Sequence, residues 1–520
     1  MKKNGWTFLL AALVAFPLMA QGNSDRPALV VGVTVDGLRD DYLSLFWNEC
    51  KAGGFERALA SGARFTHCAY PYRMAGDLAD LVTLQTGADP YLHGIPSDKV
   101  YDRKLMRACP VMEDKEVKAT QGTARVSAKA IMATTVSDEL YENTLGLSKT
   151  VSLALDPQMA VAQAGHSGLA LWIDNLSGKW AGSTYYRSGL PDWVSGKGLE
   201  AYMEKTWQPF YTVSTYEAAS GAARKGFSYA LKNECKGVKP YETLFTTPFV
   251  NTALREMAVR AIEGEGLGKD LYPDVLLVHF SIRPFAHDQR PGLSMELEDA
   301  YLRLDYDLSL LMKALDAKVG AGNWLLYFTT SRVAPDYTDA LNRRLPSRSF
   351  NAERYSGLLN SYLSAVYGSA RWVAGQQSGR VYLNRALIED KNLSLREIQD
   401  KAVEFFGLIP GVVDLSTSYQ LERDYVSGGG MCYAYTKESG ADLYYTLAPG
   451  WHEVDMKGNK TGYRAGFSQQ CTLSLCGWRV PRAQVSEPVS ALDLAATLAS
   501  WLRIMPPSGC RGAALPVIPR

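Results

Sequence analysis

The pattern of hydrophobic positions is most informative between residues 28 and 42, where the sequence reads ALVVGVTVDGLRDDY. This run of β-branched and small apolar residues is too continuous for a half-exposed strand, so it predicts a buried parallel strand with helices on both faces. The run ends in Asp36-Gly37. Because chemistry gathers at the carboxyl ends of strands in open α/β sheets, Asp36 is a candidate metal ligand. Capping of the next helix is the alternative role for an aspartate at this position.

The chain that follows predicts a helix over residues 49–62 and a short strand over residues 63–68. Much later, residues 343–368 are rich in Arg and Tyr and are predicted to be helical. Residues 379–414 read as a strand, a helix over residues 394–406 and a second strand. That order indicates a small inserted α+β unit.

Two further stretches have structural and functional interpretations. Gly428, Gly429 and Gly430 lack the preceding strand and following helix of a phosphate-binding loop, so a linker is favoured. Eight of the large aromatic residues between positions 172 and 216 fit either a subdomain core, the commoner role, or the lining of a cleft. They are Trp172, Trp180, Tyr185, Tyr186, Trp193, Trp207, Tyr211 and Tyr216.

Composition describes an ordinary globular chain. With 520 residues, 47% hydrophobic and 21% charged, it is long enough for one large domain with insertions or for two domains. Its formal charge of +1 gives no reason to expect nucleic acid or an anionic membrane surface as partner.

The N-terminus has the pattern of a secretory signal peptide over residues 1–20. Lys2 and Lys3 precede an apolar stretch that ends in Ala20-Gln21. No cysteine precedes Cys50, so there is no lipoprotein acceptor, and no later apolar run is long enough to span a bilayer. We therefore expect a periplasmic or secreted protein without a transmembrane segment after cleavage.

Eight cysteines in an oxidising compartment favour some disulfides, although their connectivity cannot be deduced from the sequence. Cys471 and Cys476 are an odd number of residues apart, so on one strand they would face opposite sides of the sheet. We therefore do not expect these two cysteines to pair with each other.

A family resemblance appears at residues 70–95. The segment TLQTG followed by ADPYLHGI, downstream of VDGLR, resembles the alkaline phosphatase superfamily, in its type I phosphodiesterase and nucleotide pyrophosphatase branch. The likeness is nearest to the phosphate-irrepressible (PafA-type) alkaline phosphatases, and residues 164–186, 246–270 and 296–316 support it. It implies an α/β fold with a central, mostly parallel sheet between helices and with inserted smaller subdomains. The domain would span residues 24–520, with insertions at about 110–245 and 340–445.

The resemblance also implies a site with two divalent metals, usually zinc, six Asp or His ligands, and a Thr or Ser nucleophile. Matched residue by residue, the first ligand is Asp36 and is retained. Asp77 takes the place of the nucleophile, and Asp98 that of an Asn that contacts phosphate. Asp156 and Gln158 take the places of a Lys and an Arg that clamp the phosphate.

The remaining ligand positions have lost their identities as well. They hold Pro284 and Asp288, then Ser331 and Arg332, and finally Gln470, with His287 one residue away from a His position. We therefore expect no zinc pair as cofactor, while calcium or magnesium, which prefer oxygen ligands, stay possible at the carboxylates. The guanidinium of Arg332 would either replace the metal cation and pair with Asp36 or Asp77, or point to solvent.

The sequence thus predicts a secreted alkaline phosphatase-like pseudoenzyme that serves as a binding or assembly component of the cell envelope, with an unidentified envelope protein as partner. One alternative is an active metal-dependent hydrolase of phosphate mono- or diesters. Another is a non-catalytic binder of a phosphorylated or sulfated ligand. In a re-invented site, Asp77 would itself carry a phosphoryl group. The clustered carboxylates are expected to raise one another's pKa and to repel phosphate.

Overall fold

A computed structural model describes residues 25–73, 76–194, 196, 198–218, 226–237, 239–286, 294–330, 348–428, 433–448, 450–459 and 469–519. The predicted signal peptide, residues 1–20, lies outside these ranges. None of the helices in the described part of the chain is both long and apolar enough to cross a membrane.

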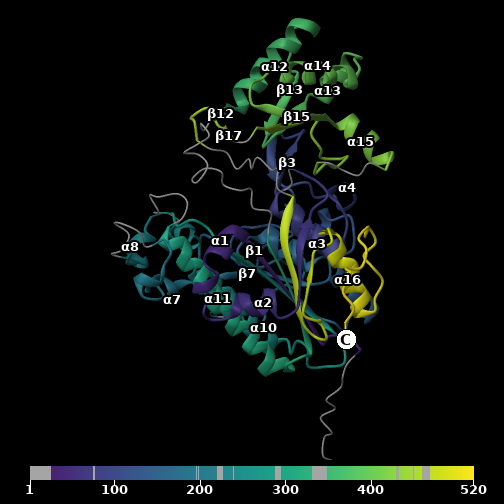
Figure 1. Ribbon diagram of the computed structural model, residues 1–520. Coiled ribbons are helices and arrows are strands. Elements are labelled where there is room, and N and C mark those ends of the chain that lie inside the picture. The colour runs from purple at the N-terminus through teal and green to yellow at the C-terminus, as the bar shows by residue number, and fades with distance from the viewer. Residues whose placement is uncertain are drawn as a thin grey trace, which may run out of the picture.

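One large sheet forms the centre of the molecule (Figure 1). In spatial order its strands are β19 (Ala483–Val485), β2 (Ala63–Ala69), β18 (Gln470–Gly477), β11 (Trp324–Thr330), β1 (Leu29–Asp36), β10 (Asp274–Ser281), β5 (Thr150–Ala154), β6 (Leu169–Ile173) and β7 (Trp180–Gly182), and β20 (Val489–Ser490) also pairs with β2. Strands β11, β1, β10, β5 and β6 run parallel, whereas β18 and β7 are antiparallel to their neighbours.

Strand β1 is the middle of this sheet, as its apolar pattern predicts. All eight of its residues are buried, and it pairs in parallel with β10 and β11 along its length. A side chain at Gly32 is impossible, because a Cβ there would lie 2.2 Å from the hydroxyl of Tyr327 on β11. Gln85 donates to the same hydroxyl at 2.9 Å, which ties the sheet to a helix on one face.

Helices cover both faces and give the three-layer α/β arrangement that the family resemblance implies. One face packs against α1 (Asp40–Leu45), α2 (Gly54–Ala60), α10 (Phe249–Gly264) and α11 (Met295–Leu315). The other packs against α3 (Asp77–Thr86), α5 (Val136–Asn143), α6 (Pro157–Ala164) and α16 (Asp493–Leu502). The predicted fold class is confirmed.

The helix predicted over residues 49–62 is shorter in the structure, since α2 begins only at Gly54. Gly53 has a left-handed backbone, with φ of +78°, which breaks the chain from the preceding turn. Asp305 of α11 then accepts hydrogen bonds from the N–H groups of Ala52 and Phe55 at 2.9 and 2.7 Å. A carboxylate from a distant helix therefore sets this start, which local sequence cannot reveal.

The region between β7 and α10 consists of short elements: α7 (Glu200–Met203), β8 (Thr206–Trp207), β9 (Tyr229–Ala230), α8 (Leu231–Glu234) and α9 (Pro240–Leu244). Asp299 of α11 holds this region by accepting from Trp207 Nε1 at 2.7 Å and from the Tyr216 hydroxyl at 2.5 Å. Trp172, Trp180, Trp207 and Tyr216 are all buried, which favours the core interpretation for these four aromatics.

A smaller lobe with its own core is built from residues 348–454 and stands above the large sheet in the view of Figure 1. Its four-stranded sheet has the order β13 (Val373–Gln377), β14 (Arg380–Leu383), β16 (Leu443–Leu447) and β15 (Val412–Thr417), beside a pair formed by β12 (Arg348–Asn351) and β17 (Trp451–Val454). Its helices are α12 (Ala352–Tyr367), α13 (Arg385–Asp390), α14 (Leu395–Gly407) and α15 (Ser418–Val426). The predicted strand, helix and strand over residues 379–414 are confirmed, with α13 in addition.

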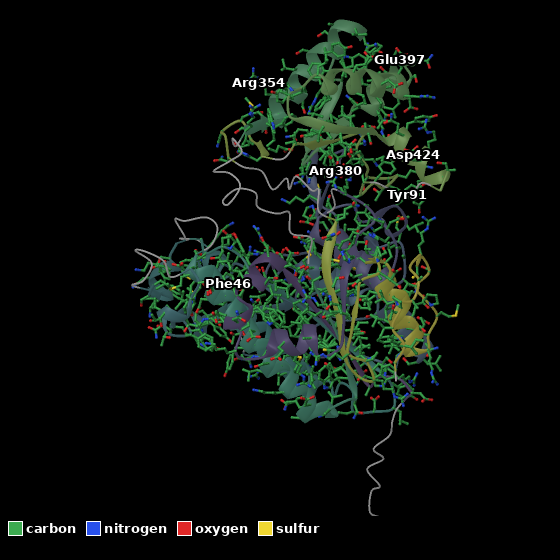
Figure 2. The ribbon with its side chains drawn as sticks, viewed as in Figure 1. Phe46, Tyr91, Arg354, Arg380, Glu397 and Asp424 are labelled. Carbon is green, nitrogen blue, oxygen red and sulfur yellow. The ribbon has the colours of Figure 1, made fainter. Side chains whose placement is uncertain are left out.

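The hairpin of β3 (Lys99–Asp102) and β4 (Arg107–Pro110) joins the two parts. The Tyr101 hydroxyl donates to the carbonyl of Ala374 at 2.6 Å, and its ring belongs to the core of the small lobe. Arg380 reaches back from the lobe and donates to the carbonyl of Pro96 at 3.2 Å (Figure 2). The lobe is therefore fixed to the main body by a segment that lies far from it in sequence.

Candidate functional site

The positions predicted to form the site converge at one edge of the large sheet. Strands β1, β10, β11 and β5 are parallel, so their carboxyl ends lie at the same edge, and the antiparallel strand β18 begins there. Asp36, Ser281 and Thr330 end β1, β10 and β11, and Gln470 starts β18. The carboxyl edge of a parallel sheet is the usual place for a site in this class of fold.

Asp36 ends β1 with its side chain largely buried. Gly37 follows with φ of +77°, and a Cβ there would lie 2.0 Å from the carbonyl oxygen of Ile282, so only glycine fits this turn. The guanidinium of Arg283 lies next to the Asp36 carboxylate, with Nη2 3.7 Å from Oδ2. Its Nε donates to Ser281 Oγ at 2.9 Å, which holds the arginine at the end of β10.

Arg332, predicted either to pair with Asp36 or Asp77 or to point to solvent, falls within residues 331–347, which lie outside the described residues. Among the described residues, Arg283 forms an ion pair with Asp36 that the sequence did not predict. A signal for it was present, because Arg283 directly precedes Pro284, a position already matched to a metal ligand.

The positive charge of Arg283 also affects the pKa of two other groups, exposed Asp156 and buried His279. Desolvation raises the pKa of Asp156, and Arg283 together with the N–H groups at the start of α6 counteracts this rise. Burial lowers the pKa of His279 to about 4, and Arg283 adds to the lowering. Mutual repulsion of carboxylates, the expected cause, is therefore not what raises the pKa of Asp156.

Both phosphate-clamp positions have local structural tasks. Asp156 caps α6 by accepting from the N–H groups of Gln158 and Met159 at 2.8 and 3.2 Å. Gln158 Oε1 accepts from the N–H of Met112 at 3.1 Å and so anchors a neighbouring loop. These hydrogen bonds give both side chains a structural role at the start of α6.

Asp77 and Asp98 meet at the first turn of α3. Asp77 is the first residue of the helix, and Asp98 Oδ1 accepts from the N–H of Leu78 at 3.4 Å. A Cβ on Gly76 would lie 2.4 Å from Asp98 Oδ1, so the glycine leaves room for this carboxylate. The helix dipole favours negative charge at this end, which lets two carboxylates share it.

The ligand positions were tested for their fit to a zinc pair. Pro284 has no donor atom, and Gln470 offers only an exposed amide at the start of β18. Asp288, Ser331 and Arg332 lie outside the described residues. Within the described ranges no three His, Cys, Asp or Glu side chains come together as a metal-binding group. The described donor set therefore does not fit two zinc ions, each of which needs three or four N, O or S ligands.

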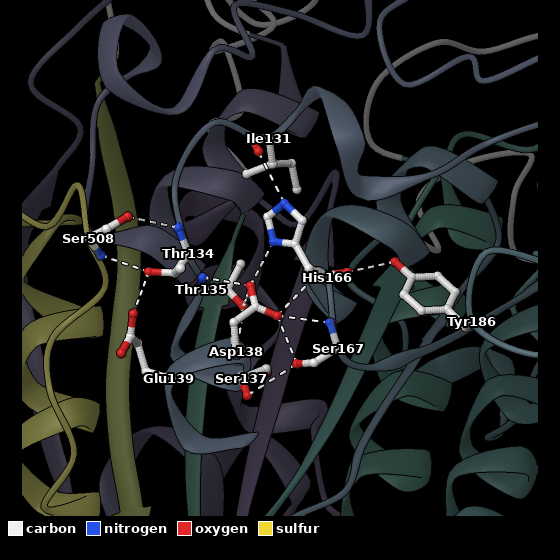
Figure 3. A network of polar contacts seen from close by, with 11 residues as sticks. Ile131, Thr134, Thr135, Ser137, Asp138, Glu139, His166, Ser167, Tyr186 and Ser508 are labelled. Atoms are coloured by element: carbon white, nitrogen blue, oxygen red, sulfur yellow. Dashed lines mark hydrogen bonds and ion pairs between the residues drawn. The ribbon is translucent and has the colours of Figure 1, made fainter. Parts of the chain in front are cut away.

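The far end of α6 is held by a buried network (Figure 3). Asp138 accepts from the N–H groups of Thr135, His166 and Ser167 at 2.9, 2.8 and 2.9 Å, and its Oδ2 lies 2.9 Å from His166 Nδ1. His166 Nε2 faces the carbonyl oxygen of Ile131 at 3.1 Å. Both ring nitrogens thus face acceptors, an arrangement that suits the doubly protonated ring.

This network shifts two pKa values in opposite directions. The hydrogen bond to Asp138 raises the pKa of His166 above its ordinary value of 6.5. Burial alone would raise the pKa of Asp138, but hydrogen bonds from His166 and Thr135 outweigh it and bring the pKa below 3.8. The Tyr186 hydroxyl completes the arrangement by donating to the carbonyl of Gly165 at 2.7 Å.

A three-layer α/β fold with polar groups gathered at the carboxyl edge of its sheet is typical of α/β proteins that bind a ligand at that edge. The chain belongs to the type I phosphodiesterase / nucleotide pyrophosphatase family, whose sequence profile matches residues 30–330. The family predicted from the sequence is thereby confirmed.

Two relatives resemble the chain over nearly its whole length. Alkaline phosphatase PafA of Elizabethkingia meningoseptica is 27% identical, with 97% of each chain covered. Alkaline phosphatase PhoV of Synechococcus elongatus is 27% identical, with 94% of this chain and 92% of the relative covered.

A crystal structure of a PafA mutant superposes with a TM-score of 0.83 at 26% identity, covering 94% of this chain and 98% of that one. Four residues are substituted in that mutant: a Thr, an Asn, a Lys and an Arg. The Thr and the Asn are as far apart along that chain as Asp77 and Asp98 are here, and the Lys and the Arg as far apart as Asp156 and Gln158. The residue types at all four matched positions differ.

Proposed function

We propose that this chain is a pseudoenzyme of its family, without phosphatase activity, and that it serves as a binding or assembly component of the cell envelope. The observation that carries the proposal is the ion pair of Arg283 with Asp36, the one ligand position whose residue type is retained. A guanidinium is charged at every physiological pH, so it supplies a permanent cation where the family would hold a metal.

Electrostatics opposes a metal beside this arginine. A unit positive charge about 4 Å from the guanidinium would be repelled by roughly 4 kcal/mol at the effective dielectric of a protein surface, and a divalent ion by more. Pro284 and Gln470 offer no anionic ligand that would offset this cost. Asp156 and Gln158, which are engaged in capping α6 and anchoring a loop, provide no positive clamp for phosphate.

Metal content is the first test. The purified mature protein is loaded with zinc, dialysed and analysed for elements, and we expect less than about one zinc per chain, because tight zinc binding needs three or four good ligands. Two tightly held zinc ions per chain would contradict the proposal. Such a result would mean that the residue-by-residue matching of the ligands is wrong around residues 284–288 and 331–332.

Turnover is the second test. The protein is assayed on aryl phosphate mono- and diesters with zinc, magnesium, calcium or no metal, beside Asp77→Ala and, as control, Asp390→Ala on the exposed end of α13. The proposal expects equal background in all three proteins. Metal-dependent turnover that vanishes only in Asp77→Ala would establish an active phosphatase with an aspartate nucleophile. The envelope partner is then sought by crosslinking in intact cells.

A second candidate function, binding of a phosphorylated or sulfated ligand without chemistry, is favoured by a cavity away from the sheet edge. About 490 Å³ in volume, it lies between the hairpin and the small lobe and is lined by Tyr101, Asn360 and Arg371 among others. Cavities of roughly 300–1,000 Å³ suit small ligands. Calorimetry with inorganic phosphate separates the sites, because binding lost in Arg371→Ala but kept in Arg283→Ala belongs to the cavity.

A further inference from the structure

Two cysteines that are distant in sequence lie side by side on neighbouring strands of the large sheet. Cys68 lies on β2 and Cys471 on β18, and they are direct partners in the antiparallel register of these strands. Their Sγ atoms are 3.5 Å apart. Both side chains are buried, with relative exposures of 1% and 7%.

The antiparallel register places these two residues where a disulfide is sterically possible. Directly opposite residues of an antiparallel pair have Cα atoms about 4.5–5.5 Å apart, within the range of about 4.4–6.8 Å found for disulfides. Bond formation needs the sulfurs to approach by about a further 1.5 Å. The register shifts between Cys471 and Leu473, and such an irregularity lets β18 adjust locally.

Two of the other described cysteines, Cys235 and Cys476, are poor competitors for this pairing. Cys476 lies on the same strand as Cys471 but packs in the opposite core, as the odd separation predicts. Burial raises the pKa of Cys476 to about 12 and that of Cys235 to about 11. The thiolate is the attacking species in disulfide exchange, so in the folded chain these two thiols are held in the unreactive form and do not displace a bond already made.

We propose that Cys68 and Cys471 form a disulfide that fastens β2 to β18 at the edge of the candidate site, whether or not the site is catalytic. The oxidant is a small-molecule or protein disulfide. One cysteine thiolate attacks it and releases one thiol, and the second cysteine attacks the resulting mixed disulfide and releases the other. The two cysteine protons and two electrons end on the two released thiols.

The position of this link gives it a structural consequence for the site. Gln470, at the last ligand position, directly precedes Cys471, and Tyr70 follows Cys68 by two residues on the way to α3. The backbones of Tyr70 and Gln469 are already joined by a hydrogen bond of 2.8 Å. Because both thiols are buried in the folded chain, exchange takes place while the strands are pairing.

The test is refolding of the full mature chain in a buffer of oxidised and reduced glutathione. A non-reducing digest analysed by mass spectrometry should contain one linked peptide with Cys68 and Cys471, lost on treatment with dithiothreitol. Ellman's reagent in denaturant should find two fewer thiols than in the reduced protein, and dithiothreitol should lower the melting temperature by several degrees.

Variants complete the test. Cys68→Ser should lose the linked peptide and the effect of dithiothreitol on melting, whereas the control Cys510→Ser should keep both. A digest of refolded wild-type protein without the linked peptide would overturn the proposal, and so would a link from Cys68 or Cys471 to Cys432, which lies outside the described residues. The digest decides the question even where a variant fails to fold.

Discussion

Replacing Asp138 by asparagine probes the network that holds the end of α6. Asp138 Oδ1 accepts from the N–H groups of His166 and Ser167, and Oδ2 accepts from the N–H and hydroxyl of Thr135. Asparagine keeps the shape of the side chain but offers one oxygen only. Whichever way the amide turns, its NH₂ group faces at least one backbone N–H, and the charge opposite His166 is lost.

The size of the effect follows from this geometry. Breaking a buried ion pair by removing one partner costs about 3–5 kcal/mol, and a hydrogen bond to a charged group contributes about 1.5–3 kcal/mol. The Asp138 side chain is 7% exposed, but that of His166 is 33% exposed, so solvent screens part of the attraction. We therefore expect Asp138→Asn to lower the free energy of unfolding by about 2–4 kcal/mol.

Urea unfolding followed by tryptophan fluorescence and circular dichroism measures this loss. The matched control is Glu139→Gln on the same helix, where one hydrogen bond of 2.6 Å from the Thr134 hydroxyl is affected. Its expected effect is below about 1 kcal/mol. A variant Asp138→Asn that unfolds within about 0.5 kcal/mol of the wild type, the usual scatter of surface substitutions, would refute the reasoning.

The same network predicts a dependence on pH. The pKa of His166 is raised in the folded protein, so its stabilising contribution is complete below its ordinary value of 6.5 and is lost as the pH rises through the folded value. The pKa of Asp138 is lowered, so its contribution is complete above 3.8 and is lost as the pH falls through its folded value. The difference in unfolding free energy between wild type and His166→Gln should therefore be largest between pH 3.8 and pH 6.5. It should shrink as the pH rises above this window through the folded pKa of His166, and as the pH falls below the window through the folded pKa of Asp138. A difference that grows steadily from neutral to alkaline pH would contradict this sign.

Two further substitutions test single contacts. Asp156→Ala removes the cap of α6 and should lower the free energy of unfolding by about 1 kcal/mol. Asp156→Asn keeps an acceptor for the cap and removes a carboxylate whose pKa is raised, so it should be neutral or stabilising in thermal melts at pH 7. Equal losses in both variants would be inconsistent with the capping role. Arg380→Met removes a buried guanidinium that donates to the carbonyl of Pro96, and should weaken the junction of the lobe by about 1–3 kcal/mol. Limited proteolysis of this variant should therefore be faster than that of the wild type. The control Arg354→Met, at an exposed position of the same lobe (Figure 2), should be cleaved at the rate of the wild type.

The sequence was most informative where a single local pattern decides the structure. The unbroken apolar run before Asp36 predicted the central strand and the edge at which polar groups gather, because only a strand covered on both faces tolerates such a run. Gly53 and Asp305 show the limit, since the start of α2 depends on a carboxylate hundreds of residues away. Arg283 was missed for a similar reason, because the carboxylate with which it pairs, Asp36, is also hundreds of residues away.

The hairpin that follows Asp98 determines where the chain can be cut to obtain the small lobe as a fragment. Lys99, the next residue, accepts through its carbonyl from Gln377 of the lobe at 3.3 Å, and Tyr101 lies in the lobe's own core. A fragment limited to residues 348–454 therefore lacks part of its hydrophobic interior, and a chimera that exchanges the lobe must carry residues 98–110 with it. The unit that folds together is discontinuous in sequence, and one of its two pieces begins at a carboxylate of the candidate site.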